Sequence, residues 1–193
     1  MASLTLAPAA TALVVIDLQK GIVGMQTHPR PASEVVANSA RLARRFRDMG
    51  APVVLVNVAF PVGGAALRPA ADVTLQLPPT APPGWEELVP ELGQQPSDIL
   101  ITKRQWGAFY GTGLDMHLRR RGVQTIVLTG IATNIGVEST ARDAYERGFH
   151  QVIVEDATAS SVSTAMHEFA HHNIFPRIAQ VRKTEEVLRA LTT

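Results

Sequence analysis

The chain has 193 residues, the size of one ordinary domain whose core buries about 70% of the surface of the unfolded form. Hydrophobic residues make up 46% of it, charged residues 18%, and the formal net charge is +1, so no basic nucleic-acid or membrane surface is expected. The lack of cysteine excludes disulfides, thiolate metal sites and thiol nucleophiles. No apolar run reaches about 18 residues, and we expect a cytoplasmic protein.

Apolar runs alternate with amphipathic stretches along the chain. The first run, TALVVID at 11–17, is β-branched and stops at a carboxylate, whereas 34–50 has helical spacing and ends at a glycine. Further strands are predicted at 51–60, 97–103, 123–130, 150–157 and 177–182, and further helices at 111–122, 134–148, 162–174 and 184–192. This alternation, with almost continuously apolar strands, predicts an α/β fold: a parallel sheet with helices on both faces.

One segment, 61–96, breaks the alternation. It contains 8 of the 13 prolines and is predicted to be a long loop with one helical turn near WEEL at 85–88. Loops of this length in a compact domain are either functional or disordered. We interpret the segment as a lid or an oligomer contact within a single domain that spans 1–193.

Two charged residues stand where apolar strands end, Asp17 and Lys103, and a glycine-containing turn follows the strand at 123–130. In an open parallel sheet, ligands bind outside the carboxyl ends of the strands. An ionisable residue at the end of a buried strand must be paired or lie in a cleft. Asp17 and Lys103 could therefore form an acid/base couple, or a structural ion pair at the rim of the sheet.

Three stretches carry a family resemblance: VVIDLQ, KRQWGAF and GIATNIGVESTARDA. They resemble the isochorismatase-like hydrolase superfamily, also called cysteine hydrolases, over about 11 to 192. The resemblance implies a six-stranded parallel sheet of order 3-2-1-4-5-6 in a Rossmann-like three-layer sandwich, with an Asp–Lys–Cys site. Asp17 and Lys103 match the first two members, and Gly136 stands at the position of the family's cysteine.

Glycine at position 136 changes the expected chemistry. Losing a nucleophile that acts as a unit with its base can cost on the order of 10⁶ in rate, so covalent amidase chemistry is not expected. By resemblance, isochorismatases also carry glycine here and cleave a vinyl ether. Asp17 would donate the proton, Lys103 would tune Asp17 and hold an anion, and Gly136 would leave room for substrate. The alternative is a catalytically inactive family member that binds or scaffolds.

The resemblance also implies the surroundings of the site. It implies a cis peptide between Ile131 and Ala132 that aims the amides of Ala132 and Gly136 into the pocket. There the two amides would stabilise negative charge, as the amides at the start of a helix do. The aromatic residues after Lys103 could wall a pocket for a ring-shaped substrate, or belong to the core or to a subunit contact. The residues expected to bind an anionic or ring-shaped small molecule are Gln19, Trp106, Phe109, Ile131, Ala132, Thr133 and Ile135.

Two further expectations concern metals and assembly. HEFAH, from His167 to His171, fits the H-E-x-x-H zinc pattern, but five-residue matches arise often by chance, and a polar helix face is the alternative. The nicotinamidase branch carries an Asp–His–His metal site after its second strand, and 57–69 has no histidine, so we expect neither metal nor cofactor. Family members are commonly oligomeric, and we expect a homodimer or larger, with 61–96 contributing contacts.

Overall fold

The structure is a computed structural model that describes residues 4–60, 70–73 and 81–192. Its strands form one six-stranded sheet in the order β3-β2-β1-β4-β5-β6, and every pairing in it is parallel. The predicted α/β class and strand order are therefore confirmed. The strands are β1 (Thr11–Ile16), β2 (Val53–Val58), β3 (Ile99–Lys103), β4 (Thr125–Ile131), β5 (His150–Ala159) and β6 (Gln180–Arg182).

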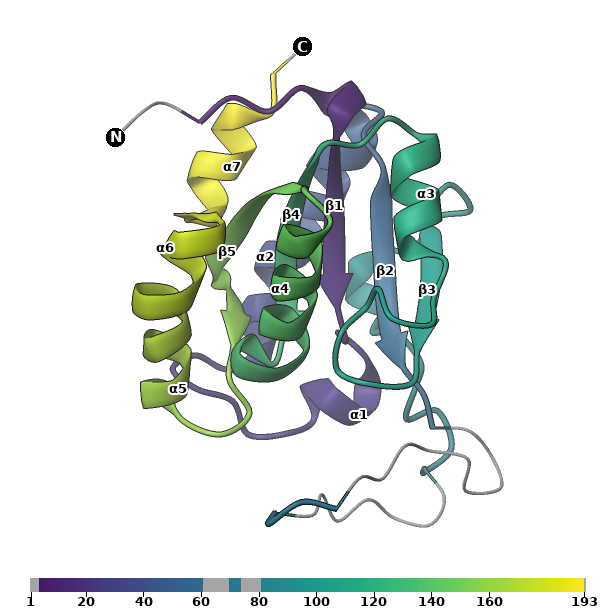
Figure 1. Cartoon of the computed structure of the whole chain (residues 1–193). Coiled ribbons are helices and arrows are strands. Elements are labelled where there is room, and N and C mark those ends of the chain that lie inside the picture. Colours follow the sequence, from purple (N-terminus) through teal and green to yellow (C-terminus); the bar gives the residue numbers. More distant parts are fainter. Residues whose placement is uncertain (1–3, 61–69, 74–80, 193) are drawn as a thin grey trace.

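Helices connect the strands and cover the sheet. They are α1 (Lys20–Val23), α2 (Ala32–Asp48), α3 (Leu114–Arg120), α4 (Glu138–Glu146), α5 (Thr164–Phe169), α6 (Phe175–Ile178) and α7 (Thr184–Ala190). Two short 3₁₀ turns, η1 (Pro8–Ala10) and η2 (Pro90–Leu92), and two π-helical segments, η3 (Thr133–Val137) and η4 (Ala170–Ile174), complete the described elements. In Figure 1 the carboxyl ends of the strands meet at the edge near α1, and both chain ends lie at the opposite edge.

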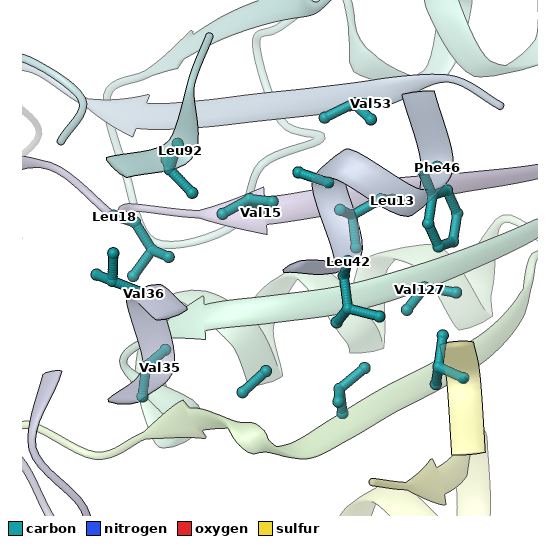
Figure 2. Packing of buried hydrophobic residues seen from close by; sticks show 14 of the residues in the cluster. Leu13, Val15, Leu18, Val35, Val36, Leu42, Phe46, Val53, Leu92 and Val127 are labelled. Carbon is teal, nitrogen blue, oxygen red and sulfur yellow. The ribbon is translucent and has the colours of Figure 1, made fainter. Parts of the chain in front are cut away.

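Alternate residues of each strand enter cores on opposite faces of the sheet, because successive strand side chains point to opposite sides. Leu13 and Val15 of β1 pack against residues of α2 such as Leu42 and Phe46, as Figure 2 shows. Val14 belongs to the second core, which α3, α4 and α6 cover. All six residues of β1 are buried, as expected for a central strand covered on both faces.

Several predicted boundaries differ from the observed ones, and two of them affect the ends of the sheet. The helix predicted at 134–148 is the π segment η3 followed by α4, so the chain enters the helix through a wide turn. The strand predicted at 177–182 is shorter, because 175–178 form the helix α6. Phe175 is fully buried, and Pro176 occupies the first turn, where the lack of an amide proton is tolerated.

The long predicted loop is described only in part. Residues 61–69 and 74–80 lie outside the described residues, so their role as lid or oligomer contact stays a prediction. The part from 81 to 96 is hydrogen-bonded to the segment that follows β1, including the start of α1. Gly21 N donates to Trp85 O at 3.0 Å, and Lys20 N donates to Glu87 O at 2.8 Å. None of the helices in the described part of the chain is long and apolar enough to cross a membrane.

Candidate active site

Asp17 directly follows β1 and has a left-handed backbone conformation, with φ of +53°. Its amide still donates to Val56 O at 2.9 Å, so the residue remains attached to the sheet. A non-glycine residue in this region carries strain of about 1–3 kcal/mol, which persists where the surrounding structure enforces it. The turn places the carboxylate beside the carboxyl ends of the neighbouring strands, and the side chain is buried.

Lys103 is the last residue of β3 and is only 2% exposed. Its Nζ lies 2.7 Å from Asp17 Oδ2 and donates a second hydrogen bond to Gln105 O at 3.1 Å. The two residues come from strands on either side of β2, so their side chains meet over the end of that strand. The structure thus forms the pair that the two strand ends predicted.

The environment of Asp17 favours its neutral form. Burial raises the pKa of this carboxyl to about 6, although the charge and hydrogen bond of Lys103 act in the opposite direction. Its second oxygen, Oδ1, is buried and has no hydrogen-bond partner among the described residues. Asp17 can therefore carry a proton near neutral pH and has one oxygen not used by the fold, two properties of a general acid.

Gly136 lies directly against this pair. A β carbon built on it would lie 3.2 Å from Asp17 Oδ2 and 3.0 Å from Ile16 Cγ2. A side chain at this position would thus contact the carboxylate, and the hydrogen of glycine leaves that space open. The structure brings together all three residues predicted to be catalytic: Asp17, Lys103 and Gly136.

A second glycine, Gly130, shapes the same turn and was missed by the sequence reasoning. Its φ is +120°, and a β carbon there would lie 2.0 Å from Ile16 O. Only glycine allows β4 to approach β1 this closely at the strand end. The signal in the sequence was the glycine that opens the motif GIATNIGVESTARDA at the end of an apolar strand.

The turn itself has the predicted backbone form, because the bond between Ile131 and Ala132 is cis. Ala132 O accepts hydrogen bonds from Ile135 N and Val137 N, both at 3.1 Å. Ile131 is buried in the core, and Ile135 packs partly buried against it. Contact between these residues and a substrate stays a prediction, as does the direction of the Ala132 and Gly136 amides.

Gln19 has a structural role that the sequence did not indicate. The side chain is fully buried, and its amide donates to Val58 O at 3.0 Å and to Trp85 O at 3.2 Å. Its Oε1 accepts from Val58 N at 2.8 Å. These bonds link the segment after β1 to the end of β2 and to Trp85, and contact between Gln19 and a substrate stays a prediction.

For Phe109, the structure agrees with the core alternative. It is buried in the second core, 5.8 Å from the ring of Phe149, with the Arg147 guanidinium 5.0 Å from its own ring. Trp106, by contrast, is 56% exposed, and its carbonyl oxygen lies 3.5 Å from the built β carbon on Gly136. Of the two aromatic residues, only Trp106 borders the site.

The histidines of HEFAH do not form the polar helix face considered from the sequence. His167 and His171 are buried, and their rings are 4.4 Å apart. Thr133, also expected to bind substrate, is fully buried and contacts His167 Nδ1 through its hydroxyl at 2.8 Å. Within the described ranges, no three acidic or histidine side chains gather where they could hold a metal ion.

A surface hollow elsewhere is separate from these groups. It is lined by Arg47, Asp98 and Arg121, at the amino ends of β2 and β3. The Asp17–Lys103 pair lies at the carboxyl ends of the strands, as the ligand sites of open parallel sheets do. We therefore take the pair and the Gly136 turn as the candidate active site.

Residues 11–186 match the family model described as the isochorismatase domain. The chain belongs to the isochorismatase family. Members of this family are hydrolases. The resemblance found in the sequence is confirmed.

Individual relatives agree with this assignment. The isochorismatase family protein YecD of Escherichia coli O157:H7 is 52% identical over 182 residues, which cover 94% of this chain and 96% of YecD. A solved structure of an isochorismatase family protein from Burkholderia thailandensis is 48% identical, covers both chains completely and has a TM-score of 0.93. The ureidoacrylate amidohydrolase RutB of Variovorax paradoxus is 30% identical over 203 residues, 93% of this chain and 81% of RutB.

Proposed function

We propose that this isochorismatase-family protein is a thiol-independent hydrolase that cleaves a vinyl ether or a related bond with water. The observation that carries the proposal is the buried Asp17–Lys103 pair beside Gly136, with the pKa of Asp17 raised to about 6. Such a pKa suits a general acid at neutral pH better than that of an exposed aspartate.

The proposed reaction balances with water as the only co-substrate. Protonated Asp17 donates its proton to the enol-ether carbon, and the resulting oxocarbenium ion adds water. The hemiketal that forms then collapses to a carbonyl compound and an alcohol, and the proton released from the added water returns to Asp17. No bond to an enzyme thiol is needed, which agrees with the lack of cysteine in the chain.

The charge of Lys103 supports an anionic substrate. While Asp17 is ionised, Lys103 pairs with it at 2.7 Å. Once Asp17 is protonated, the buried ammonium group of Lys103 loses its counter-charge, and an anionic substrate nearby would replace that charge. The preference for a ring-shaped substrate has less support, because Phe109 belongs to the core.

The similarity to RutB suggests a carbamoyl or ureido compound as a second substrate class, by its printed name. A covalent route to such compounds would need a thiol, which this chain lacks. The rival proposal is a catalytically inactive member that binds a small molecule. The unpartnered Asp17 Oδ1 agrees with both proposals, because a bound ligand or a reaction could use this buried oxygen, whereas the raised pKa of Asp17 favours catalysis.

A hydrolase screen tests the proposal. Vinyl ethers, esters, lactams and ureido amides are offered to the native protein, to Asp17→Asn and to Asp48→Asn, which changes an exposed aspartate on α2. We expect turnover of an anionic vinyl ether that falls about 10²–10⁴-fold in Asp17→Asn and is unchanged in Asp48→Asn. Binding of a compound without turnover in any class would favour the inactive rival, and turnover retained by Asp17→Asn would refute the mechanism.

A further inference from the structure

A cluster of polar side chains joins four segments of the chain behind the turn that carries Gly136. Its members are Arg30, before α2, Thr133 in η3, Thr158 on β5, His167 on α5 and His171 in η4. The Thr133 hydroxyl lies 2.8 Å from His167 Nδ1, and Arg30 Nη1 lies 3.4 Å from His167 Nε2. Arg30 in turn donates to Glu155 O at 2.9 Å and to Thr158 O at 2.6 Å, which fixes its guanidinium.

The contacts of His167 determine which ring nitrogen carries the proton. An arginine guanidinium can only donate hydrogen bonds, so the nitrogen that faces it, Nε2, must be the unprotonated one. The proton of the neutral ring then lies on Nδ1, and Nδ1 donates to the Thr133 hydroxyl. In the opposite tautomer the Nε2–H of His167 would point at the Arg30 guanidinium, and rotation of either group cannot remove the repulsion between the two donors. A threonine hydroxyl, by contrast, can turn its own proton away.

The neighbouring His171 has the opposite arrangement. Its Nε2 lies 3.0 Å from the Thr158 hydroxyl, and that hydroxyl also donates to Glu155 O at 3.0 Å. Since Thr158 has only one proton to donate, it accepts from His171 Nε2. His171 Nδ1 is buried without a partner among the described residues, as expected of an unprotonated nitrogen that faces the edge of an apolar core.

We infer that His167 is a positioning residue for the Gly136 turn: Arg30 holds it as the neutral Nδ1–H tautomer, and it donates to Thr133. Thr133 is the first residue of η3, and Gly136 lies three residues later in the same turn. A second bond from behind the turn, from Ser160 Oγ to Asn134 Oδ1 at 2.7 Å, holds the adjacent residue. That this turn takes part in turnover rests on the proposed function, whereas the tautomer and the turn geometry do not.

The tautomers are tested by long-range ¹H–¹⁵N correlation spectra of the imidazoles in the full chain at pH 7. The variants His167→Asn and His171→Asn assign the signals. We expect the proton of His167 on Nδ1 and that of His171 on Nε2, so each ring is the control for the other. A proton on Nε2 of His167, or a doubly protonated His167, would overturn the inference.

The positioning role is tested on the turn with a substrate-independent probe. In a Gly136→Cys background, the rate of thiol labelling by iodoacetamide reports the geometry of the turn. An asparagine can offer an N–H near the position of Nδ1, whereas leucine cannot. The labelling rate of His167→Asn should therefore stay within about twofold of the background. His167→Leu should change the rate about fivefold or more, which is the equivalent of one hydrogen bond. His172→Leu, a change at an exposed neighbouring histidine, is the matched control.

Each outcome of the labelling experiment is decisive once the variants are shown to be folded by their unfolding transitions. Equal rates in His167→Leu and His172→Leu would overturn the positioning role. A change in rate as large in His167→Asn as in His167→Leu would show that ring packing, and not the donor, holds the turn, and would also overturn the inference. Because neither readout needs a substrate, the inference can fail while the proposed hydrolase activity stands, and the reverse also holds.

Discussion

Two buried polar pairs flank the turn that carries Gly136, and they respond to burial in opposite ways. At Asp17–Lys103, burial raises the pKa of the acid to about 6 against the effect of its cationic partner. At His167–His171, burial and the nearby cation of Arg30 lower the two pKa values to about 4 and about 3. Removal from water disfavours the charged form of each group, so at neutral pH it brings the acid close to protonation and keeps the bases neutral.

The pairs also differ in where they lie and in what their unpartnered atoms are. Asp17 Oδ1 and His171 Nδ1 are both buried without a hydrogen-bond partner among the described residues, whereas both nitrogens of His167 have partners. The Asp17 oxygen lies at the carboxyl ends of the strands, where open parallel sheets bind ligands, and the His171 nitrogen faces the edge of an apolar core. We therefore read the first pair as the reactive one and the second as its support.

The largest effect is expected from a substitution that breaks the Asp17–Lys103 pair. Lys103→Met removes the cation and leaves Asp17 buried, and breaking such a pair destabilises a protein by about 3–5 kcal/mol. Because Lys103 lowers the pKa of Asp17, that pKa should rise further, so the loss should be greatest at alkaline pH. Chemical denaturation measures it. The double variant Asp17→Asn, Lys103→Met, which buries no lone charge, should recover part of the stability, and no recovery would contradict the pairing.

The pH dependence of turnover separates an acid from a base at Asp17. If Asp17 donates the proton, the active form is lost as the pH rises through about 6. The rate on a substrate found in the screen should then fall about tenfold per pH unit above that value, as the protonated fraction does. A rate that instead rises through pH 6 would mean that Asp17 acts as a base.

The supporting pair should dominate the pH dependence of stability between pH 4 and 6.5. The histidines titrate at 6.5 when unfolded and at about 4 and 3 when folded, so they reduce stability as the pH falls through this window. Asp17 titrates at 3.8 unfolded and about 6 folded, so its contribution is present at low pH and is lost as the pH rises. Because two histidines outweigh one carboxyl, the free energy of unfolding should rise by about 1 kcal/mol per pH unit near pH 5.

Denaturation midpoints at several pH values measure this slope. The groups that face the two rings are Arg30, Glu155, Lys183 and His172, and they are unchanged in the variants. In the double variant His167→Asn, His171→Asn, the slope should decrease, because only Asp17 of the three groups remains. An unchanged slope would show that the two histidines are not held neutral in the folded protein.

A smaller effect is expected when a thiol is placed beside the reactive pair. In Gly136→Cys the new side chain lies at the start of the η3–α4 helix and beside Asp17 Oδ2, which pairs with Lys103 at 2.7 Å. The helix start and the lysine lower a thiol pKa, whereas the charge of Asp17 acts in the opposite direction. We expect the variant to fold after shifts of a few tenths of an ångström, because its β carbon meets Ile16 and Asp17 at 3.0 and 3.2 Å. Iodoacetamide should label it faster than a free thiol at pH 7. Slower labelling would favour the inactive rival.

A change at the expected subunit contact should have the smallest effect on the Asp17–Lys103 and His167–His171 pairs. The helix α5 turns His167 inward and exposes Met166 and Phe169, which are 47% and 58% accessible. We propose that such apolar residues form part of a homodimer contact, which light scattering would show as a mass above the 20.8 kDa of one chain. Phe169→Ser should weaken the dimer and leave the imidazole spectra of His167 unchanged. A single-chain mass at micromolar concentration would refute the contact.

The sequence by itself determined the sheet and the reactive pair. Continuous apolar runs report burial on both faces, and the charged residues that end two of them must meet at one edge of a parallel sheet. Asp17 and Lys103 could therefore be named in advance, and the resemblance to the family supplied Gly136, the strand order and the cis bond.

The tertiary structure alone decided the roles of Gln19, Phe109, His167 and His171. Each makes its contacts with partners that are far away in the sequence, such as Val58 for Gln19 and Phe149 for Phe109. Whether a histidine on a helix is exposed or buried depends on what packs against that helix, and its tautomer depends on a cation 137 positions away. Local pattern reports which residues can be buried, but the protonation and the bonding of a buried polar group are set by neighbours that only the fold brings together.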